Sequence, residues 1–114
     1  MGYSIYWKHR KSFDTNQWLK IVNHFNTNLN DETVDLDHAF FTDGEIFFNG
    51  AKGGTCETFC LTREKPSQEF NFCKTQELPY DKVIWKLLKF VKEEVVGLNN
   101  PDFEISNDNG EEIV

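Results

Sequence analysis

Long apolar runs are missing from this sequence. No stretch approaches the roughly 20 apolar residues that a membrane-spanning helix needs. The first residues, Met-Gly-Tyr-Ser-Ile-Tyr-Trp-Lys, also lack the basic and then apolar layout of a signal peptide. We therefore predict a cytoplasmic protein without a membrane partner.

Cysteine is scarce, and no Cys-x-x-Cys pair occurs. The three cysteines are Cys56, Cys60 and Cys73. An odd number of unpaired cysteines fits free thiols in a reducing compartment. Cys56 and Cys60 are four residues apart in a predicted strand, about 13 Å along it, which is too far for a disulfide or a shared zinc ion. We predict reduced structural thiols, no metal site and no cofactor. A cysteine nucleophile is disfavoured because the three histidines fall in separate elements.

Basic residues are outnumbered, with 12 Lys and Arg against 19 Asp and Glu and a net charge of −7. Direct nucleic-acid binding is disfavoured because phosphate contacts need clustered Lys and Arg. Residues 31–45 contain no Lys or Arg, and their six acids are Asp31, Glu32, Asp35, Asp37, Asp43 and Glu45. This block fits a surface that mimics phosphates for a basic partner, or a solvated face that protects a strand from aggregation. It lacks the layout of a calcium-binding loop.

The sequence is rich in aromatic residues. They make up 15 % of its 114 residues and include 11 Phe and 3 Trp. That much apolar surface excludes intrinsic disorder. The length fits one domain, which we assign to residues 1–114.

Alternating apolar residues predict strands near residues 3–8, 33–40, 46–49, 55–63, 70–73 and 101–105. Helical spacing predicts two helices, one capped by Ser12 or Asp14 and one capped by Asp81 and ended by Gly97. The element order is β-α-β-β-β-β-α-β. Strands joined by hairpins, together with two amphipathic helices, indicate an α+β fold: a single antiparallel sheet with both helices on one face.

The same patterns lead to three further expectations, two about burial and one about a loop. Leu87, Leu88 and Val91 form the apolar face of the second helix and are expected to pack against Ile5, Trp7, Phe70 or Phe72. His38 falls on the apolar side of its strand and is expected to be buried. The glycine-rich stretch 50–54 joins two strands, so a hairpin loop is favoured over a phosphate-binding loop.

Four stretches carry a resemblance: Gly-Gly-Thr-Cys-Glu-Thr-Phe at 53–59, Phe-Asn-Phe-Cys-Lys-Thr at 70–75, Pro-Tyr-Asp at 79–81 and Phe-Glu-Ile-Ser-Asn-Asp-Asn-Gly at 103–110. Together they resemble a group of small uncharacterised bacterial and bacteriophage proteins with the pattern Gly-His-Glu-Thr-Phe, Phe-x-Phe-Cys-Lys-Thr, Pro-Tyr-Asp and Ser-Ser-Asp-Gly. The resemblance covers about the C-terminal half and most of the first strand. Cys56 replaces the histidine of that pattern, and Asn107 replaces a serine. No activity comes with the resemblance, but it implies a set of recurrent polar residues: Glu57, Lys74, Thr75, Tyr80 and Asp81.

These five residues allow two interpretations. Lys74 and Thr75 end a strand, Tyr80 and Asp81 open a helix, and Glu57 can lie across the sheet, so the side chains could converge into a site. The other interpretation is a capping network that fixes the strand-to-helix turn without a ligand.

Two functions therefore compete. The first is a small acidic protein-binding module, monomeric or homodimeric, of the kind a phage encodes to inhibit a host protein; its aromatic residues would serve as interface anchors. The second is a small-molecule binding or hydrolytic domain that uses Glu57, Lys74, Tyr80 and Asp81, which requires a pocket lined by these groups.

Overall fold

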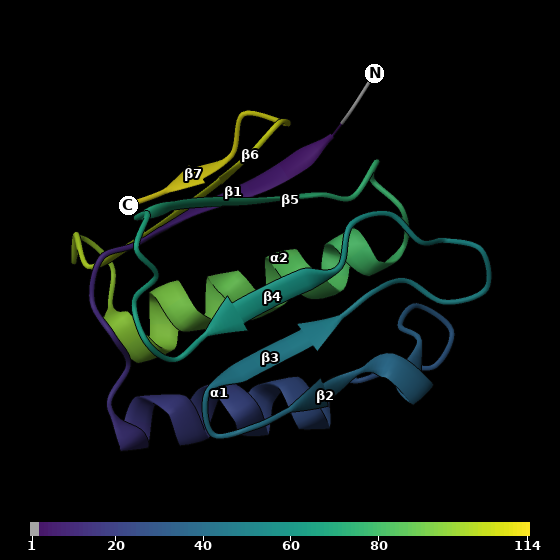
Figure 1. Cartoon of the computed structure of the whole chain (residues 1–114). Coiled ribbons are helices and arrows are strands. Elements are labelled where there is room, and N and C mark those ends of the chain that lie inside the picture. The colour runs from purple at the N-terminus through teal and green to yellow at the C-terminus, as the bar shows by residue number, and fades with distance from the viewer. Residues whose placement is uncertain (1–2) are drawn as a thin grey trace.

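The computed structural model describes residues 3–114 and confirms the α+β class (Figure 1). The strands are β1 (Ser4–His9), β2 (Phe40–Phe41), β3 (Glu45–Phe48), β4 (Phe59–Thr62), β5 (Phe70–Lys74), β6 (Phe103–Asn107) and β7 (Glu112–Ile113). The helices are α1 (Thr15–Thr27) and α2 (Tyr80–Phe90), with a 3-10 turn η1 (Leu36–His38) and a π-helical segment η2 (Val91–Val96). The predicted element order is correct, with β7 as an addition at the end.

The strands form two antiparallel sheets, which corrects the expectation of a single sheet. One sheet has four strands in the order β5-β1-β6-β7, and the other is the meander β2-β3-β4. β5 does not continue the meander beside β4, because it pairs with β1 along its whole length. β1 buries Ile5 and Trp7 and is paired on both sides, by β5 and β6, so it is a central strand of its sheet.

Helix α2 lies below the four-stranded sheet and behind β4, and α1 lies below α2 (Figure 1). The predicted apolar face of α2 is correct, since Leu87, Leu88 and Val91 are buried. The rings of Trp7 in β1 and Phe59 in β4 pack with centroids 5.2 Å apart. One continuous core therefore joins the two sheets.

Helix α1 begins with a reciprocal cap at Asp14, which is one of the two predicted cap residues. The Asp14 carboxylate accepts a hydrogen bond from the Gln17 backbone N–H at 2.8 Å, and the Gln17 side chain accepts from the Asp14 backbone N–H at 2.9 Å. This capping box satisfies two donors that a helix start leaves free. At the other end of the helical layer, Gly97 follows η2 with a φ of 108°, which confirms it as the residue that ends the helix.

The orientation of β5 was predicted wrongly. Phe70 and Phe72 point to solvent with 49 % and 51 % exposure, whereas Cys73 is buried. The register with β1 places Cys73 opposite Ile5, and that pairing turns the two phenylalanines outward. A strand that shifts by one residue exchanges its two faces, and the alternation alone does not reveal which face is buried.

The strand expected over residues 33–40 is also mostly absent. Val34 makes only an isolated bridge to Gly50, and η1 follows it. The Asp35 carboxylate accepts from the Asp37 backbone N–H at 3.2 Å and contacts His38 Nδ1 at 2.8 Å. Local side-chain hydrogen bonds of this kind favour a turn over a strand. His38 is consequently exposed and not buried as expected.

Candidate functional site

The resemblance residues meet where β5 turns into α2, and Glu57 brings the meander to this point. The Glu57 carboxylate accepts from the Lys74 backbone N–H at 2.7 Å, and the Glu57 backbone N–H donates to the Lys74 carbonyl at 3.1 Å. These bonds connect the segment before β4 to the end of β5. Both side chains remain exposed at the surface.

Tyr80 lies on the buried side of the same junction and bonds to both of its segments. Its side chain is fully buried, and its hydroxyl donates to the Glu57 carbonyl at 2.7 Å and approaches the Lys74 carbonyl at 3.3 Å. Burial, reinforced by the neighbouring Cys73, raises the pKa of the Tyr80 hydroxyl. The hydroxyl therefore stays protonated at neutral pH and acts as a hydrogen-bond donor.

Asp81 does not cap α2 as predicted. The helix begins at Tyr80, so Asp81 lies in its first turn. The Asp81 carboxylate accepts a short hydrogen bond from the buried Thr75 hydroxyl. Burial raises the pKa of Asp81, while the bond from Thr75 acts in the opposite direction. The Thr75 hydroxyl also accepts from the Glu77 backbone N–H at 3.3 Å, so it fixes the turn before the helix.

The five residues therefore converge, and their contacts fix the strand-to-helix turn without a side-chain cap on α2. Glu57 and Tyr80 bond to backbone groups of Lys74 and Glu57, and the Thr75 hydroxyl bonds to Asp81 and to the Glu77 backbone. Of the five, Asp81 alone lines the larger surface groove beside α2, which measures about 650 Å³. The arrangement favours the structural interpretation of this set.

Gly50 packs against this junction and gives a first testable prediction. A Cβ at Gly50 would lie 1.8 Å from the Gly54 carbonyl oxygen and 3.0 Å from Tyr80 Cδ1. We expect Gly50→Ala to lower the free energy of unfolding by about 3 kcal/mol, the upper end for an overpacked site. Gly44→Ala is the matched control because nothing lies within 4 Å of its added Cβ. Urea unfolding measures both variants, and equal stabilities would contradict this packing.

The acidic block surrounds the start of the meander. Asp35 and Asp37 belong to the η1 turn, Asp43 lies in the turn between β2 and β3, and Glu45 begins β3. Asp37 and Asp43 are exposed, whereas Asp35 is partly committed to its bonds with Asp37 and His38. Two of the predicted acids thus precede β2 and the other two follow it, at opposite ends of that strand.

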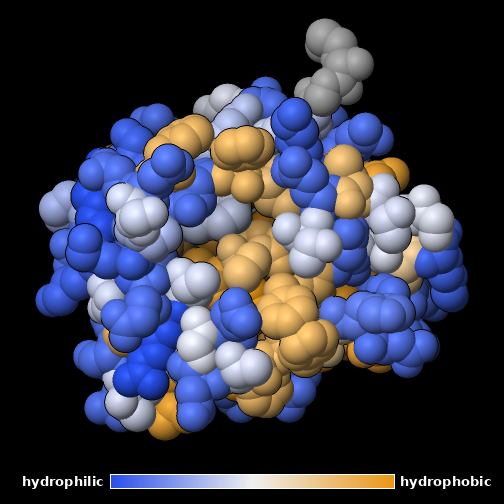
Figure 2. Space-filling view, in the orientation of Figure 1, coloured by the Kyte–Doolittle hydropathy of each residue, from blue (hydrophilic) through white to orange (hydrophobic). Residues whose placement is uncertain are grey.

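The outer surface of this sheet carries a row of apolar side chains, which we name the meander face and define by Phe40, Phe47 and Cys60. Phe40 pairs with Phe47 and Phe47 with Cys60 in the ladder, so the three residues lie side by side across the sheet. The rings of Phe40 and Phe47 contact each other with centroids 3.9 Å apart. Figure 2 shows apolar side chains gathered over β3 and β4 on this side of the molecule.

The cysteines lie in three different environments. All three are free: Cys73 is buried, Cys56 is half-buried and Cys60 is exposed. Burial raises the pKa of Cys73 to about 12, and burial together with the neighbouring Glu45 raises the pKa of Cys60. Raised values keep both thiols protonated and weakly nucleophilic. Within residues 3–114, no group of three His, Cys, Asp or Glu side chains is placed to hold a metal ion.

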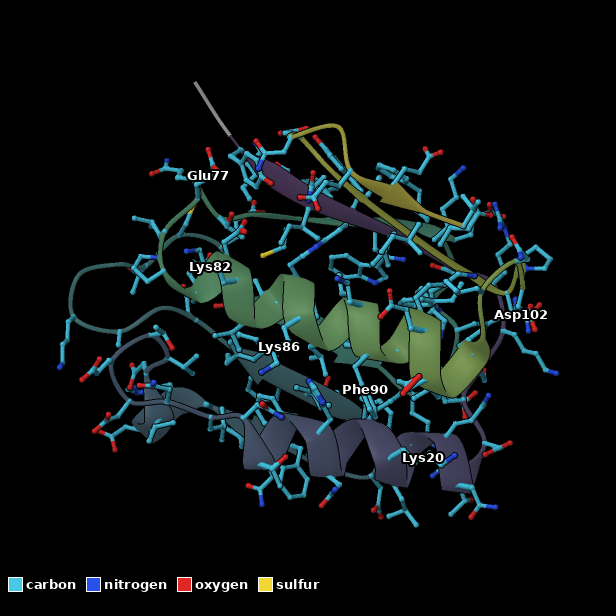
Figure 3. The ribbon with its side chains drawn as sticks, turned by 180° about the vertical axis from the view of Figure 1, so that it is seen from behind. Lys20, Glu77, Lys82, Lys86, Phe90 and Asp102 are labelled. Atoms are coloured by element: carbon cyan, nitrogen blue, oxygen red, sulfur yellow. The ribbon has the colours of Figure 1, made fainter. Side chains whose placement is uncertain are left out.

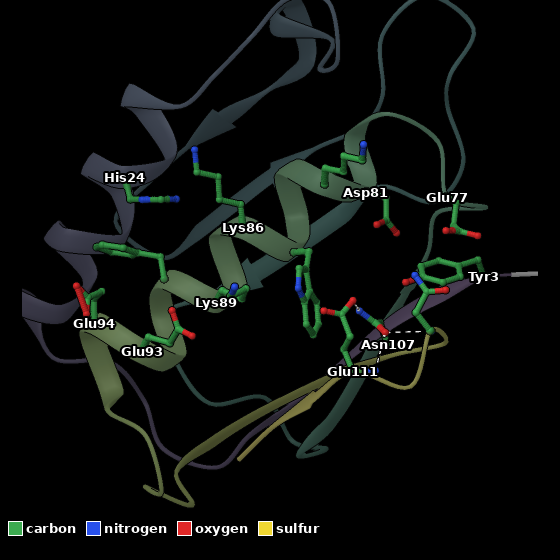
Figure 4. A pocket seen from close by; sticks show the side chains of 14 residues that line it. Tyr3, His24, Glu77, Asp81, Lys86, Lys89, Glu93, Glu94, Asn107 and Glu111 are labelled. Atoms are coloured by element: carbon green, nitrogen blue, oxygen red, sulfur yellow. Dashed lines mark hydrogen bonds between the residues drawn. The ribbon is translucent and has the colours of Figure 1, made fainter.

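The sequence analysis missed two grooves that flank α2. Figure 4 shows the larger one, with Tyr3 and Glu111 at one end and His24 at the other. The second groove, of about 500 Å³, lies between α1 and α2, and we name it the helix groove. The spacing of Lys82 and Lys86 places both on one face of α2, but the sequence gives no sign of the contact between α1 and α2 that forms the groove.

No protein-family model, no curated protein and no solved structure matches this chain. In the part of the chain that the structure describes, neither helix combines the length and apolar character that a membrane crossing requires.

Proposed function

We propose that this chain is a small acidic protein-binding module that docks a basic protein surface on the meander face. The observation that carries the proposal is that two features lie close together: an exposed phenylalanine on β2 in contact with a half-buried one on β3, and acids in the turns next to the same strands. Interfaces combine aromatic anchors at the centre with a polar rim in this way.

The anchors supported by the geometry are Phe40 and Phe47. Phe40 is 47 % exposed and Phe47 is half-buried, and their mutual contact holds both rings in place before a partner arrives. Aromatic side chains that are already ordered lose little entropy on binding. Cys60 extends the apolar row as a protonated thiol, which fits a reducing cytoplasm.

The acids supply attraction at longer range. Asp37 and Asp43 are exposed and have no Lys or Arg neighbour in the sequence between residues 31 and 45. A charge of one sign around an apolar centre raises the association rate with a partner of the other sign. The same acids can occupy the place of nucleic-acid phosphates on a basic protein. The resemblance to bacteriophage proteins adds the proposal that the partner is a host protein and that binding inhibits it.

The experiment that tests the proposal is affinity capture from a host lysate with wild type and with Phe40→Ser/Phe47→Ser. Phe70→Ser/Phe72→Ser is the matched control, because these two phenylalanines are at least as exposed as Phe40 and Phe47 but lie on the other sheet. We expect a stoichiometric basic protein that the meander-face variant loses and the control retains. Equal capture by all three proteins, or the absence of any stoichiometric partner, contradicts the proposal.

Neutralising the rim is expected to slow association. The variant Asp37→Asn/Asp43→Asn/Glu45→Gln leaves Asp35 in place, because Asp35 holds the η1 turn. We expect the association rate with the captured partner to fall about tenfold at low ionic strength, and the difference to shrink as salt screens the charges.

Surface plasmon resonance at two ionic strengths measures this rate. Glu93→Gln/Glu94→Gln/Glu112→Gln is the control, because it removes the same number of negative charges far along the chain from the meander. A rim variant that associates as fast as wild type at low salt removes the acids from this account. The acids would then be only a solvated face.

A further inference from the structure

The helix groove combines an apolar floor with two lysines. Phe25 from α1 and Leu87 from α2 are buried at its base, and Val83 is half-buried beside them. Its volume of about 500 Å³ lies within the range of pockets that bind small molecules, roughly 300 to 1,000 Å³. The groove can therefore accept an apolar group of considerable size.

Lys82 and Lys86 lie at the edge of this groove, one helical turn apart on the same face of α2 (Figure 3). Both side chains are exposed, and within residues 3–114 neither forms an ion pair. Lys86 Nζ donates to Asn28 Oδ1 at 3.0 Å, which directs it toward α1. The two ammonium groups are thus available to a ligand without the loss of an internal ion pair.

The charged side chains that line the helix groove sum to a small positive charge. Glu77 also lines the groove and contributes one negative charge, so Lys82, Lys86 and Glu77 sum to about +1. His24 stacks on Phe90 with ring centroids 4.2 Å apart, and burial together with Lys86 lowers its pKa, so it is neutral at pH 7. On a chain of net charge −7, this groove is a local site for one negative charge.

We propose that the helix groove binds a small monoanion with an apolar body, of the class of long-chain or aromatic carboxylates. The apolar body lies against Phe25, Val83 and Leu87, and the anionic group lies between Lys82 and Lys86. This site is separate from the meander face, so it adds a ligand to the proposed protein-binding module.

A polyanion or an anionic membrane surface fits the same lysines less well. Acids surround the lysines on the remainder of this side of the molecule: Glu77, Asp81, Glu93 and Glu94 line the larger groove together with Lys82, Lys86 and Lys89. Extended basic surfaces bind nucleic acid and anionic lipid because their charge is not compensated nearby. Here the compensation limits the attraction to one small anion.

The test compares two fluorescent probes of nearly the same shape. Anilinonaphthalene sulfonate has one negative charge, whereas phenylnaphthylamine lacks the sulfonate and is neutral. We expect wild type to bind the sulfonate, and Lys82→Gln/Lys86→Gln to weaken that binding at least about tenfold, the loss of charge-assisted hydrogen bonds. The affinity for the neutral probe should not change. Lys89→Gln is the matched control, because Lys89 lies on the same helix but lines only the larger groove.

Displacement and NMR identify the ligand class and the place of binding. We expect dodecanoate to displace the sulfonate probe and dodecanol to displace it poorly. In the dodecanoate titration, the backbone amide signals of Val83 and Leu87 should shift. An unchanged sulfonate affinity in the double variant, an equal loss for both probes, or shifts confined to the meander face each overturns the proposal. These outcomes leave the protein-binding proposal untouched, since it is tested by residues of the other surface.

Discussion

Leu88→Ala is expected to lower the free energy of unfolding by roughly 2 to 5 kcal/mol. Leu88 has no exposed surface and belongs to the apolar face of α2, which contributes to the core shared by both sheets. Truncation removes apolar contacts and leaves a cavity in this core. Urea unfolding monitored by tryptophan fluorescence measures the loss.

Leu19→Ala is the matched control for that measurement. Leu19 also lies inside a helix, but its side chain is 60 % exposed. We expect its replacement to change the free energy of unfolding by less than about 0.5 kcal/mol. A similarly small loss for Leu88→Ala would place Leu88 on the surface and contradict the orientation of α2.

Acid is expected to destabilise this protein well before its carboxylates are protonated, because of His9. The His9 ring is 1 % exposed, stacks on Phe13 with centroids 4.7 Å apart, and its Nε2 has no hydrogen-bond partner within residues 3–114. Burial lowers the pKa of His9 to about 4, while a backbone contact with Lys11 acts weakly in the opposite direction. The native state therefore keeps this ring neutral.

The sign of the effect follows from the two pKa values. The unfolded chain binds a proton at His9 below its ordinary pKa of 6.5, whereas the folded chain does so only near 4. The contribution of the neutral His9 to the free energy of unfolding is fully present above pH 6.5. It falls by about 3 kcal/mol as the pH decreases to 4. His24, whose pKa is also lowered, acts in the same direction, and Asp81, whose pKa is raised, acts in the opposite one.

The variant His9→Leu separates His9 from these other groups. It fills a similar volume and cannot titrate, so its stability should depend much less on pH between 6.5 and 4. Urea unfolding at four pH values measures both slopes. Parallel curves for wild type and His9→Leu would show that the buried imidazole is not the cause.

Local patterns in this sequence predicted local structure well. The spacing of Leu87, Leu88 and Val91 gave the buried face of α2, because one helix face must meet the core whatever its neighbours are. Asp14 was one of two predicted caps for the first helix and is the one the structure has, whereas the cap predicted at Asp81 was wrong. The element order followed from these local assignments.

Predictions that depended on distant partners failed. The outward orientation of Phe70 and Phe72 is fixed by the register with β1, some sixty residues away, and the alternation fits either face. The single sheet was wrong for the same reason, because β1 and not β4 is the neighbour of β5. One local prediction failed as well: Asp35, three residues before His38, initiates a turn, although the alternation had indicated a strand there.

The candidate site was predictable in part. One of the two interpretations brought Glu57 and Tyr80 together, and the structure places both at one junction. The helix groove could not be anticipated. It requires α1 and α2 to lie side by side, and the sequence contains no local signal for that contact between segments far apart in the chain.

The division into two sheets also determines how entropy is distributed when the chain folds. The meander uses residues 40–62, and its longest connection is residues 49–58, so each of its strands finds its neighbour within a short stretch of chain. The four-stranded sheet joins β1 to β6, with His9 opposite Phe103, and this closes a loop of most of the chain. Because the entropy lost on closing a loop grows with its length, the four-stranded sheet bears most of that loss. Contact order therefore places the slow step of folding in the sheet that contains β1.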